Sequence, residues 1–387
     1  MIFSMIKNIL KTKEIADIAV PLDDGLPDFI TKDDVVDVSA EQLFYMRVKP
    51  EDVNVMPTTK CNLKCEYCLS SGKHAKKEDL IDAADDFVEN IANLLKNEHP
   101  RPHMILSGGE ITFMKDWPGI VKNLLANKVH VMMITNLAKI MDDAEIETLS
   151  SLGQILISID TPDIELAKKF RSKTQLENIV YNIIRIRSYC AMKDIAIPPL
   201  SFHCTLGSQT IRSLPELVSM AHACGVPHVH VNEVTMHNDI NFEYKPVTFY
   251  GERTRQETIS LFNDAFSMAN RLGVRISVVD GLIDAVQNPI NENLTAGKTR
   301  LCFDPWKMLL FGVDGAIHTC CNGYPAVSNL YEVSSLKEIF FGSANTKCKT
   351  ELLTGELSKE CIRCTRRKIV DIDDFKIQLE DYLSYPG

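Results

Sequence analysis

The chain has 387 residues, of which 45% are hydrophobic and 24% are charged, and these fractions are ordinary for a globular protein with a large core. Its formal net charge of -10 argues against nucleic acid or an acidic membrane surface as a partner. No apolar run is long enough to span a membrane, and Lys7, Lys11 and Lys13 interrupt the region where a signal peptide would be apolar, so we predict a cytoplasmic protein.

The first two thirds of the chain alternate between short apolar runs and helical patterns. Residues 1–50 hold one amphipathic segment and loop-like sequence, and we treat them as an N-terminal extension. In residues 51–235 the apolar runs predict buried parallel strands at 53–57, 103–108, 129–136, 154–160, 200–206 and 228–234. Helical patterns between them lie at 77–96, 116–127, 142–152, 174–190 and 213–224. This alternation predicts an α/β fold with right-handed crossovers, a partial (βα)6 TIM-like barrel.

The rest of the chain is predicted to form three further parts. Residues 236–301 are a linker with a helical segment, and residues 302–370 are a small C-terminal α+β domain with short strands and glycine turns. Residues 371–387 are a C-terminal helix. Within these parts we expect a strand at 275–280 and helices at 251–272, 335–342, 344–354 and 371–384.

Three cysteines follow the first predicted strand in the spacing CxxxCxxC, as Cys61, Cys65 and Cys68. Disulfides are not expected in the cytoplasm, and thiolates are soft ligands that suit iron-sulfur clusters or zinc. Reactive groups of parallel α/β folds gather at the carboxyl ends of the strands, where this loop is expected to lie. Three thiolates leave one iron of a [4Fe-4S] cluster open, whereas a structural zinc site needs a fourth ligand. The spacing alone leaves both readings open.

A second group of cysteines lies in the last quarter of the chain. Four thiolates can close a full site, either an iron-sulfur cluster or a structural zinc site, and their spacing does not separate the two. The predicted ligands are Cys302, Cys320, Cys361 and Cys364. Cys321 is an alternative to its neighbour Cys320, and Cys348 is a possible spare ligand.

The chain resembles the radical S-adenosylmethionine (SAM) superfamily in two motifs. The CxxxCxxC motif has the aromatic Tyr67 before its last cysteine, and Gly108, Gly109 and Glu110 follow the second strand. The resemblance covers roughly 52–235 and implies an enzyme in which SAM binds the open iron of a [4Fe-4S] cluster. Reductive cleavage of SAM to a 5′-deoxyadenosyl radical, and an external electron donor such as flavodoxin or ferredoxin, are implied with it. A binding module for iron-sulfur or zinc without catalysis is the alternative.

The resemblance also implies which residues contact SAM. Gly108 and Gly109 are expected to allow close backbone approach, and Glu110 to accept a hydrogen bond from the SAM ammonium group. Asn136 and Ser158, which end the third and fourth strands, are expected to contact the ribose and the carboxylate.

Five further residues carry weaker expectations of the same kind. The backbone of Tyr67 is expected to contact the adenine of SAM, and the Arg171 side chain is expected to bind the SAM carboxylate. Asp160 either contacts SAM or caps the helix that follows it. Asn232 and Glu233, at the end of the sixth strand, are expected to face adenine or substrate.

The C-terminal run "C…PW…DG…HTCC" with the later "CIRC" resembles the SPASM/Twitch extension, which carries auxiliary [4Fe-4S] clusters. No cysteine follows Cys364, which favours a single auxiliary cluster. Four protein thiolates leave no position for substrate, so the cluster is expected to accept an electron in a net oxidation.

The residues before the barrel bear on the class of substrate. The segment before the barrel looks short for a leader-recognition domain, which favours a small molecule or sugar over a peptide. The alternative is a radical maturase that crosslinks or epimerises a ribosomal peptide or protein. For epimerisation, Cys204 is the candidate hydrogen donor.

Overall fold

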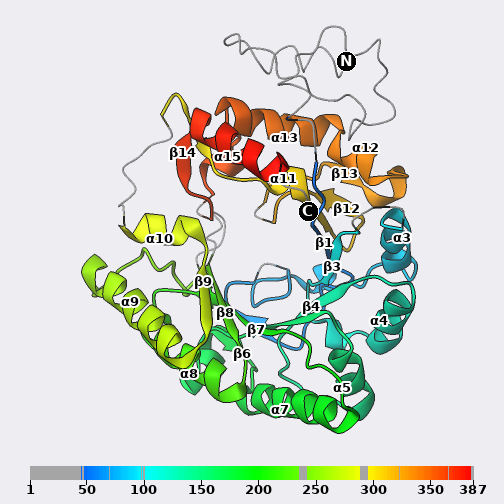
Figure 1. Cartoon of the computed structure of the whole chain (residues 1–387), viewed down its shortest axis with the longest axis vertical. Coiled ribbons are helices and arrows are strands. Elements are labelled where there is room, and N and C mark those ends of the chain that lie inside the picture. The colour runs from blue at the N-terminus through cyan, green and yellow to red at the C-terminus, as the bar shows by residue number, and fades with distance from the viewer. Residues whose placement is uncertain are drawn as a thin grey trace.

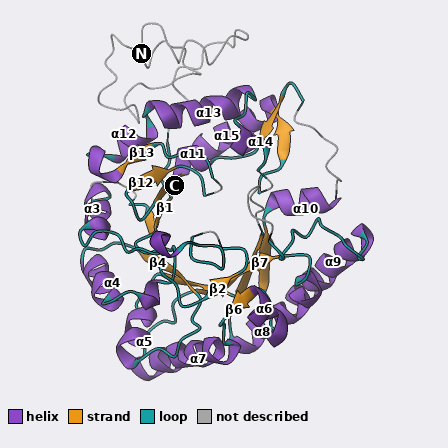
Figure 2. Ribbon diagram, turned by 180° about the vertical axis from the view of Figure 1, so that it is seen from behind, coloured by secondary structure: helices purple, strands orange, loops and turns teal. Residues whose placement is uncertain are grey.

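The computed structural model describes residues 45, 48–68, 70–96, 98, 101–234, 242–287, 295–321, 323–364 and 366–384. The predicted N-terminal extension therefore lies almost wholly outside the described residues. One curved sheet occupies the middle of the molecule, and helices cover its outer side (Figure 1). The helices of the last fifth of the chain gather at one end, opposite the helices α5 and α7 (Figure 2).

Six parallel strands of this sheet correspond to the six predicted strands, and the predicted fold class is confirmed. Each is an apolar run that is buried between the barrel interior and the helices, so its side chains alternate between the two sides. The strands are β1 (Asp52–Val55), β3 (His103–Leu106), β4 (Val131–Thr135), β5 (Gln154–Ser158), β7 (Leu200–Leu206) and β8 (His228–Glu233).

The crossover helices begin and end where the sequence provides caps. Asp142 and Glu145 form a capping box before α5, and Gly225 ends α8 with φ +66°. The helices are α3 (Phe87–Leu94), α4 (Trp117–Ala126), α5 (Asp143–Ser150), α6 (Ile164–Phe170), α7 (Leu176–Lys193) and α8 (Leu214–Cys224).

The predicted helix at 77–96 is replaced by a short 3-10 turn, η2 (Lys77–Asp79), and by α3. Between them the backbone is extended, because Asp82 forms a bridge with Thr58 after β1. The Thr58 hydroxyl donates to the Asp82 carboxylate at 2.7 Å, so tertiary contacts override the helical pattern here.

Both ends of the barrel sheet are extended by strands from later in the chain. At one edge β9 (Arg275–Val278) pairs in parallel with β8. At the other edge β11 (Met308–Phe311) pairs in parallel with β1, followed by the antiparallel β12 (Ala316–His318) and β13 (Ser328–Asn329). The C-terminal part therefore shares its sheet with the barrel, and the boundaries predicted at 235 and 302 stay predictions.

A second core contains Tyr45, Trp306, Leu352 and Phe375, whereas α9, α10, η5 and α12 of the remaining elements contribute to the main core. The Trp306 indole donates to the carbonyl oxygen of Tyr45 at 2.9 Å and so ties the start of the described chain to this core. The elements are α9 (Arg255–Leu272), α10 (Asp280–Gln287), β10 (Lys298–Arg300), α11 (Asp304–Lys307), η5 (Leu330–Glu332), α12 (Leu336–Phe340), α13 (Ser343–Thr354), α14 (Lys359–Ile362), β14 (Ile369–Asp371) and α15 (Ile372–Ser384).

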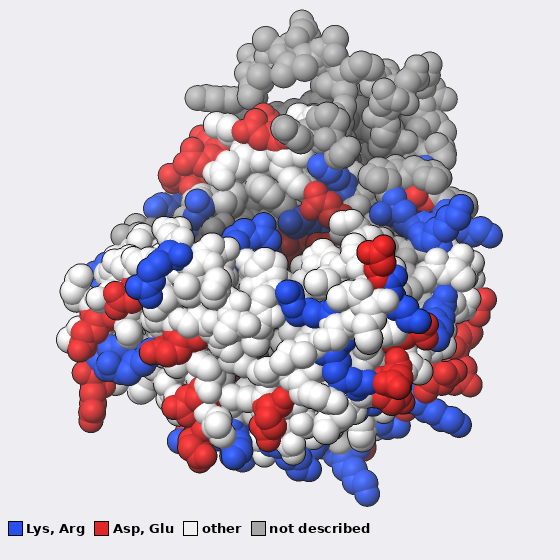
Figure 3. Space-filling view, turned by 60° about the horizontal axis from the view of Figure 1, so that its bottom comes forward, with Lys and Arg blue, Asp and Glu red and all other residues white. Residues whose placement is uncertain are grey.

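Two surface properties bear on the partners expected from the sequence. Lysine and arginine side chains are interspersed with aspartate and glutamate around the face shown in Figure 3. Among the helices of the described residues, none combines the length and the apolarity that crossing a membrane requires.

Candidate functional site

The three cysteines of the CxxxCxxC motif lie together in the loop after β1. Cys65 is buried, and Cys61 and Cys68 pack beside it with Leu63 and Ala138 in one small cluster. Within this loop the two-residue strand β2 (Lys64–Cys65) pairs with β6 (Arg171–Ser172), which follows α6. The pairing sets Cys65 opposite Arg171, so a residue more than one hundred positions later is fixed against the cysteine loop.

The two glycines after β3 allow their loop to pack directly on the cysteine loop. The Gly109 amide donates to the Thr58 carbonyl at 2.8 Å, and the Glu110 amide donates to the Lys60 carbonyl at 2.8 Å. A Cβ atom on Gly109 would lie 2.1 Å from the Lys60 carbonyl oxygen. Gly108 has φ +109°, and a Cβ there would lie 2.5 Å from the Thr58 carbonyl oxygen. The backbone that these glycines approach is therefore that of the chain itself, and their approach to SAM stays a prediction.

The Glu110 carboxylate joins the loops after β3 and β4. Its Oε1 accepts from the Thr112 amide at 3.1 Å and from the Thr112 and Thr135 hydroxyls at 2.7 Å each. Its Oε2 accepts from the Asn136 amide at 2.7 Å. The side chain is buried, so four protein donors replace the water that its charge would otherwise hold.

Asn136 extends this network to the cysteines. Its Nδ2 donates to the side-chain oxygen of Asn62 at 2.9 Å and lies 3.8 Å from Cys61 Sγ. The amide of Leu63 also donates to Cys61 Sγ, at 3.4 Å. Hydrogen bonds to a cysteine sulfur stabilise its thiolate and adjust the potential of a cluster bound to it.

Tyr67, Asp160 and Arg171 form a buried triad beside the cysteines. The Tyr67 hydroxyl donates to Asp160, and Arg171 Nη1 donates to the Tyr67 oxygen at 2.8 Å and lies 3.3 Å from Asp160 Oδ1. The second function proposed for Asp160, capping a helix, is not seen, because Asp163 caps α6. Arg171 Nε is buried without a hydrogen-bond partner.

A segment after the β8 loop covers the triad, and no motif in the sequence predicts this contact. Tyr244 stacks on the Tyr67 ring with the centroids 5.1 Å apart, and its hydroxyl donates to the Thr205 carbonyl at 2.8 Å. Glu66 accepts from the Glu243 amide at 3.0 Å. Because the Tyr67 ring is already packed, only its backbone remains for the predicted contact with adenine.

Burial raises the pKa of the Cys61 thiol to about 11 and that of Cys65 to about 12. Binding of iron would therefore release protons from both groups. Within the described ranges, no three His, Cys, Asp or Glu side chains surround one point closely enough to hold a single metal ion. A cluster does not require that arrangement, because each of its thiolates binds a different iron.

The C-terminal cysteines line one pocket. The antiparallel pair β10–β14 brings residue 301 next to 368, where the Leu301 amide donates to the Lys368 carbonyl at 3.0 Å. The pocket contains all four predicted ligands and the alternative that we considered, and these are Cys302, Cys320, Cys321, Cys361 and Cys364. Cys348 on α13 is hydrogen-bonded to Cys361 behind them.

Three arginines surround this pocket. Arg300 donates to the carbonyl of Ile362 at 2.7 Å and so holds the CxxC turn. Arg367 pairs with Asp304 at 2.7 Å. Arg366 reaches out of the pocket and donates to the side-chain oxygen of Asn232, at the end of β8, at 3.0 Å. The last contact joins the cysteine pocket directly to the barrel interior.

The barrel interior carries a row of polar side chains at one level. The strand register aligns Ser158 on β5, His203 on β7, His230 on β8 and Ser277 on β9. Ser158, a predicted SAM contact, thus lies at the beginning of this row. Cys204 faces the opposite way, into the core between the sheet and the helices, and is 1% exposed. Its position therefore does not fit the hydrogen donor considered for epimerisation.

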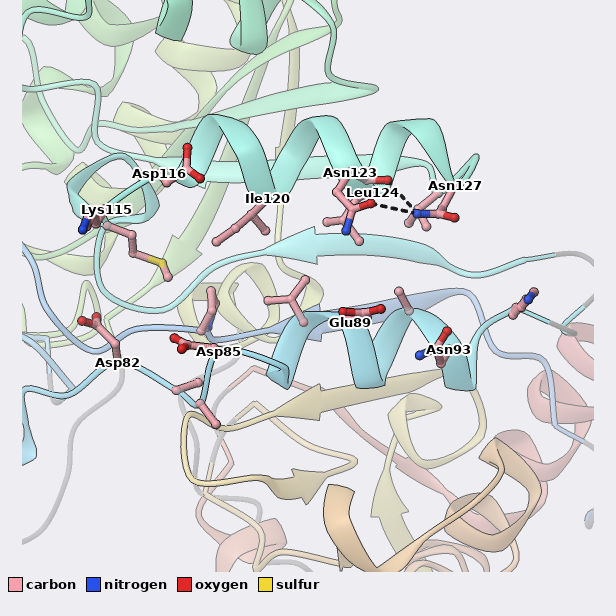
Figure 4. A pocket seen from close by; sticks show the side chains of 18 of the residues that line it. Asp82, Asp85, Glu89, Asn93, Lys115, Asp116, Ile120, Asn123, Leu124 and Asn127 are labelled. Atoms are coloured by element: carbon pink, nitrogen blue, oxygen red, sulfur yellow. Dashed lines mark hydrogen bonds between the residues drawn. The ribbon is translucent and has the colours of Figure 1, made fainter.

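A cavity of about 620 Å³ lies elsewhere, on the outer side of the barrel between α3 and α4. Figure 4 shows Asp82, Asp85 and Glu89 along one side of it, and Asp116, Asn123 and Asn127 along the other. None of the predicted site residues lines this cavity.

Comparisons with known proteins assign the first of these sites. Residues 55–197, which contain the cysteine loop and the Gly-Gly-Glu loop, match the radical SAM superfamily. This part of the chain is a radical SAM domain. A probable GTP 3′,8-cyclase of Methanococcus maripaludis strain C7 is 23% identical over 253 residues, which are 64% of this chain and 80% of the relative.

Two solved structures resemble this chain in fold. SuiB of Streptococcus suis, bound to S-adenosylmethionine, superposes with a TM-score of 0.58 at 13% identity and covers 77% of this chain and 67% of its own. The enzyme anSMEcpe with bound AdoMet superposes with a TM-score of 0.57 at 16% identity and covers 81% of this chain and 83% of its own. At these identities the likeness concerns the fold alone.

Proposed function

We propose that this radical SAM enzyme catalyses a net oxidation of a small molecule or sugar with the help of an auxiliary [4Fe-4S] cluster. The observation that carries the proposal is the C-terminal pocket, which is lined by five cysteines from three separate segments. Free cysteines in such number along one pocket suit a soft metal centre. Cys302, Cys320, Cys361 and Cys364 would hold the auxiliary cluster and would leave no position on it for substrate.

The residues around Cys61, Cys65 and Cys68 fit a cluster that binds SAM. When bound, SAM and a reduced [4Fe-4S] cluster supply a 5′-deoxyadenosyl radical for hydrogen abstraction, and an auxiliary cluster supplies an acceptor for the second electron of an oxidation. Arg171 offers its unpartnered Nε–H group to the SAM carboxylate. The covering segment at Tyr244 keeps water away from the triad around Arg171.

Iron content and SAM cleavage test the proposal. Anaerobically reconstituted protein should hold about eight irons, and replacing Cys361 and Cys364 with Ala should leave about four. With a chemical reductant standing in for flavodoxin or ferredoxin, both proteins should convert SAM to 5′-deoxyadenosine. Replacing Cys61, Cys65 and Cys68 with Ala should also leave about four irons but should abolish 5′-deoxyadenosine formation. Wild-type protein with about four irons and one zinc would contradict the auxiliary cluster.

A purine nucleotide is the second candidate substrate, because the relative covered over 80% of its length is named a probable GTP 3′,8-cyclase. Incubation of the reconstituted protein with SAM, reductant and GTP distinguishes the two. Consumption of GTP together with 5′-deoxyadenosine formation would replace the oxidation proposal by this second candidate.

A further inference from the structure

A chain of hydrogen bonds crosses strands β8 and β9 on the interior side of the barrel. Arg275 Nη2 lies 3.2 Å from His228 Nδ1, and His228 Nε2 lies 2.8 Å from the Ser277 hydroxyl. The same hydroxyl lies 2.8 Å from His230 Nδ1. The four side chains therefore form one continuous chain from Arg275 to His230.

Arg275 determines which atom donates in each of these hydrogen bonds. A guanidinium group can only donate, so His228 Nδ1 must accept and His228 Nε2 must carry the proton. His228 then donates to Ser277, and the Ser277 hydroxyl is left to donate to His230 Nδ1. His230 is thereby a neutral imidazole whose Nε2 carries the proton. Burial, and next the nearby Arg366, lower the pKa of His230, which agrees with a neutral ring.

Asn232 is the acceptor at the end of this chain. His230 is hydrogen-bonded to the Asn232 side chain, and Arg366 Nη2 donates to Asn232 Oδ1 at 3.0 Å. His230 and Arg366 thus hold the Asn232 side-chain oxygen, and the hydrogens of Asn232 Nδ2 face away from these two residues. In the described part of the chain, nothing accepts a hydrogen bond from this Nδ2 group.

Arg366 brings one positive charge to this point, at the edge of the pocket that the cysteines line. Within the described residues its side chain donates to Asn232 and forms no salt bridge with a carboxylate. The two nearest strand-end carboxylates are used elsewhere: Asp160 pairs with Arg171, and Glu233 turns to the helix side, where it accepts from the Val247 amide at 3.1 Å. Burial, followed by His230 and His228, lowers the pKa of His203 to about 3, so this neighbouring imidazole is neutral and adds no charge to the site.

We infer that Asn232 and Arg366, oriented by the chain from Arg275 to His230, form a recognition site for an oxyanion of the substrate, a carboxylate or a phosphate. The site offers two donors, the Asn232 amide and the positively charged Arg366 guanidinium, and together they complement such a group. It lies where the barrel interior meets the cysteine pocket, so an anchored substrate would lie between the two predicted clusters. The inference deepens the proposed function and rests on it for the assignment of this interior as the substrate site.

Anion binding by the full-length reconstituted protein tests the inference. The probes are inorganic phosphate and acetate, each compared with chloride at equal ionic strength, and binding is measured by calorimetry and by the rise in melting temperature. We expect wild-type protein to bind at least one probe, Arg366→Gln to weaken that binding at least tenfold, and Asn232→Ala to weaken it several-fold. Binding of phosphate alone assigns a phosphate group to the substrate, and binding of acetate assigns a carboxylate.

The matched control is Arg363→Gln, which removes the same charge from an exposed position on the same turn and should leave the anion affinity unchanged. Ser277→Ala breaks the chain without touching the anion site and should weaken binding several-fold, because the orientation of Asn232 is lost. Wild-type protein that binds neither probe, or equal affinities in wild type and Arg366→Gln, overturns the inference. Iron content and 5′-deoxyadenosine formation are measured on the same wild-type preparation, so failure of the proposed function is seen separately from failure of anion binding.

Discussion

Replacement of Glu110 by Gln separates two functions of this residue, a structural connection between loops and a contact with SAM. The carboxylate accepts three hydrogen bonds through Oε1 and one through Oε2, and it is 2% exposed. Whichever way the Gln amide turns, its NH2 group faces at least one donor. The smallest loss is the bond from the Asn136 amide, and losing a hydrogen bond to a charged group costs about 1.5–3 kcal/mol. We therefore expect the unfolding free energy to fall by at least this amount.

The assay is urea unfolding of iron-free protein, in which SAM binding cannot contribute. Thr135→Val is the comparison variant, because it removes one donor to the same carboxylate and the acceptor of the Leu137 amide, and it should also cost about 1.5–3 kcal/mol. A contact with the SAM ammonium predicts in addition a fall in SAM affinity of roughly one to two decades at unchanged iron content. An iron-free Glu110→Gln protein as stable as wild type would refute the structural connection derived from these four bonds.

Three further substitutions test other contacts of the site. Gly109→Ala places a Cβ 2.1 Å from the Lys60 carbonyl oxygen. It should therefore lower the unfolding free energy in urea by about 1–3 kcal/mol and lower the iron content. Gly119→Ala is the control: its Cβ meets the Asp116 carboxylate, and neither quantity should change. Asp160→Asn leaves Arg171 buried without its counter-charge and should lower the unfolding free energy by about 3–5 kcal/mol. Tyr67→Phe removes one neutral hydrogen-bond partner of Arg171 and should lower it by about 1 kcal/mol. A smaller loss for Asp160→Asn than for Tyr67→Phe would show that stability does not depend on the ion pair. Burial raises the pKa of Glu233 from 4.5 to about 7, so the folded state holds a proton that the unfolded chain releases between these values. Stability should fall by up to about 3 kcal/mol as pH rises from 4.5 to 7, and Glu233→Gln should flatten this slope in unfolding measured at both ends of the window.

The strands and most crossover helices could be predicted because they depend on local pattern. A run such as residues 200–206 is apolar enough to require burial on both sides, and β7 has these bounds in the structure. In the run "HVHVNEV" the alternation of polar and apolar residues places His228, His230 and Asn232 on one side of a strand. That alternation was the available signal for the polar interior.

Contacts between distant segments could not be predicted in the same way. The strands β2 and β6 have two residues each, too few to show a period, yet they set Cys65 against Arg171. The Gly-Gly-Glu motif was found, but the partner of its carboxylate is a backbone amide after β4, which no residue type reveals. The covering segment at Tyr244 also depends on stacking with Tyr67, a contact across residues that share no motif.

The pairing of β1 with β11 has a consequence for synthesis of the protein. Asp52 pairs with Met308, so roughly 250 residues are translated between the two strands. At about 5–20 residues per second this takes tens of seconds, during which one edge of the first barrel strand has no partner. An unpaired strand edge is a template for association with other chains. We therefore expect nascent or truncated chains that end before residue 308 to aggregate and to need chaperones, although they contain all six strands of the barrel.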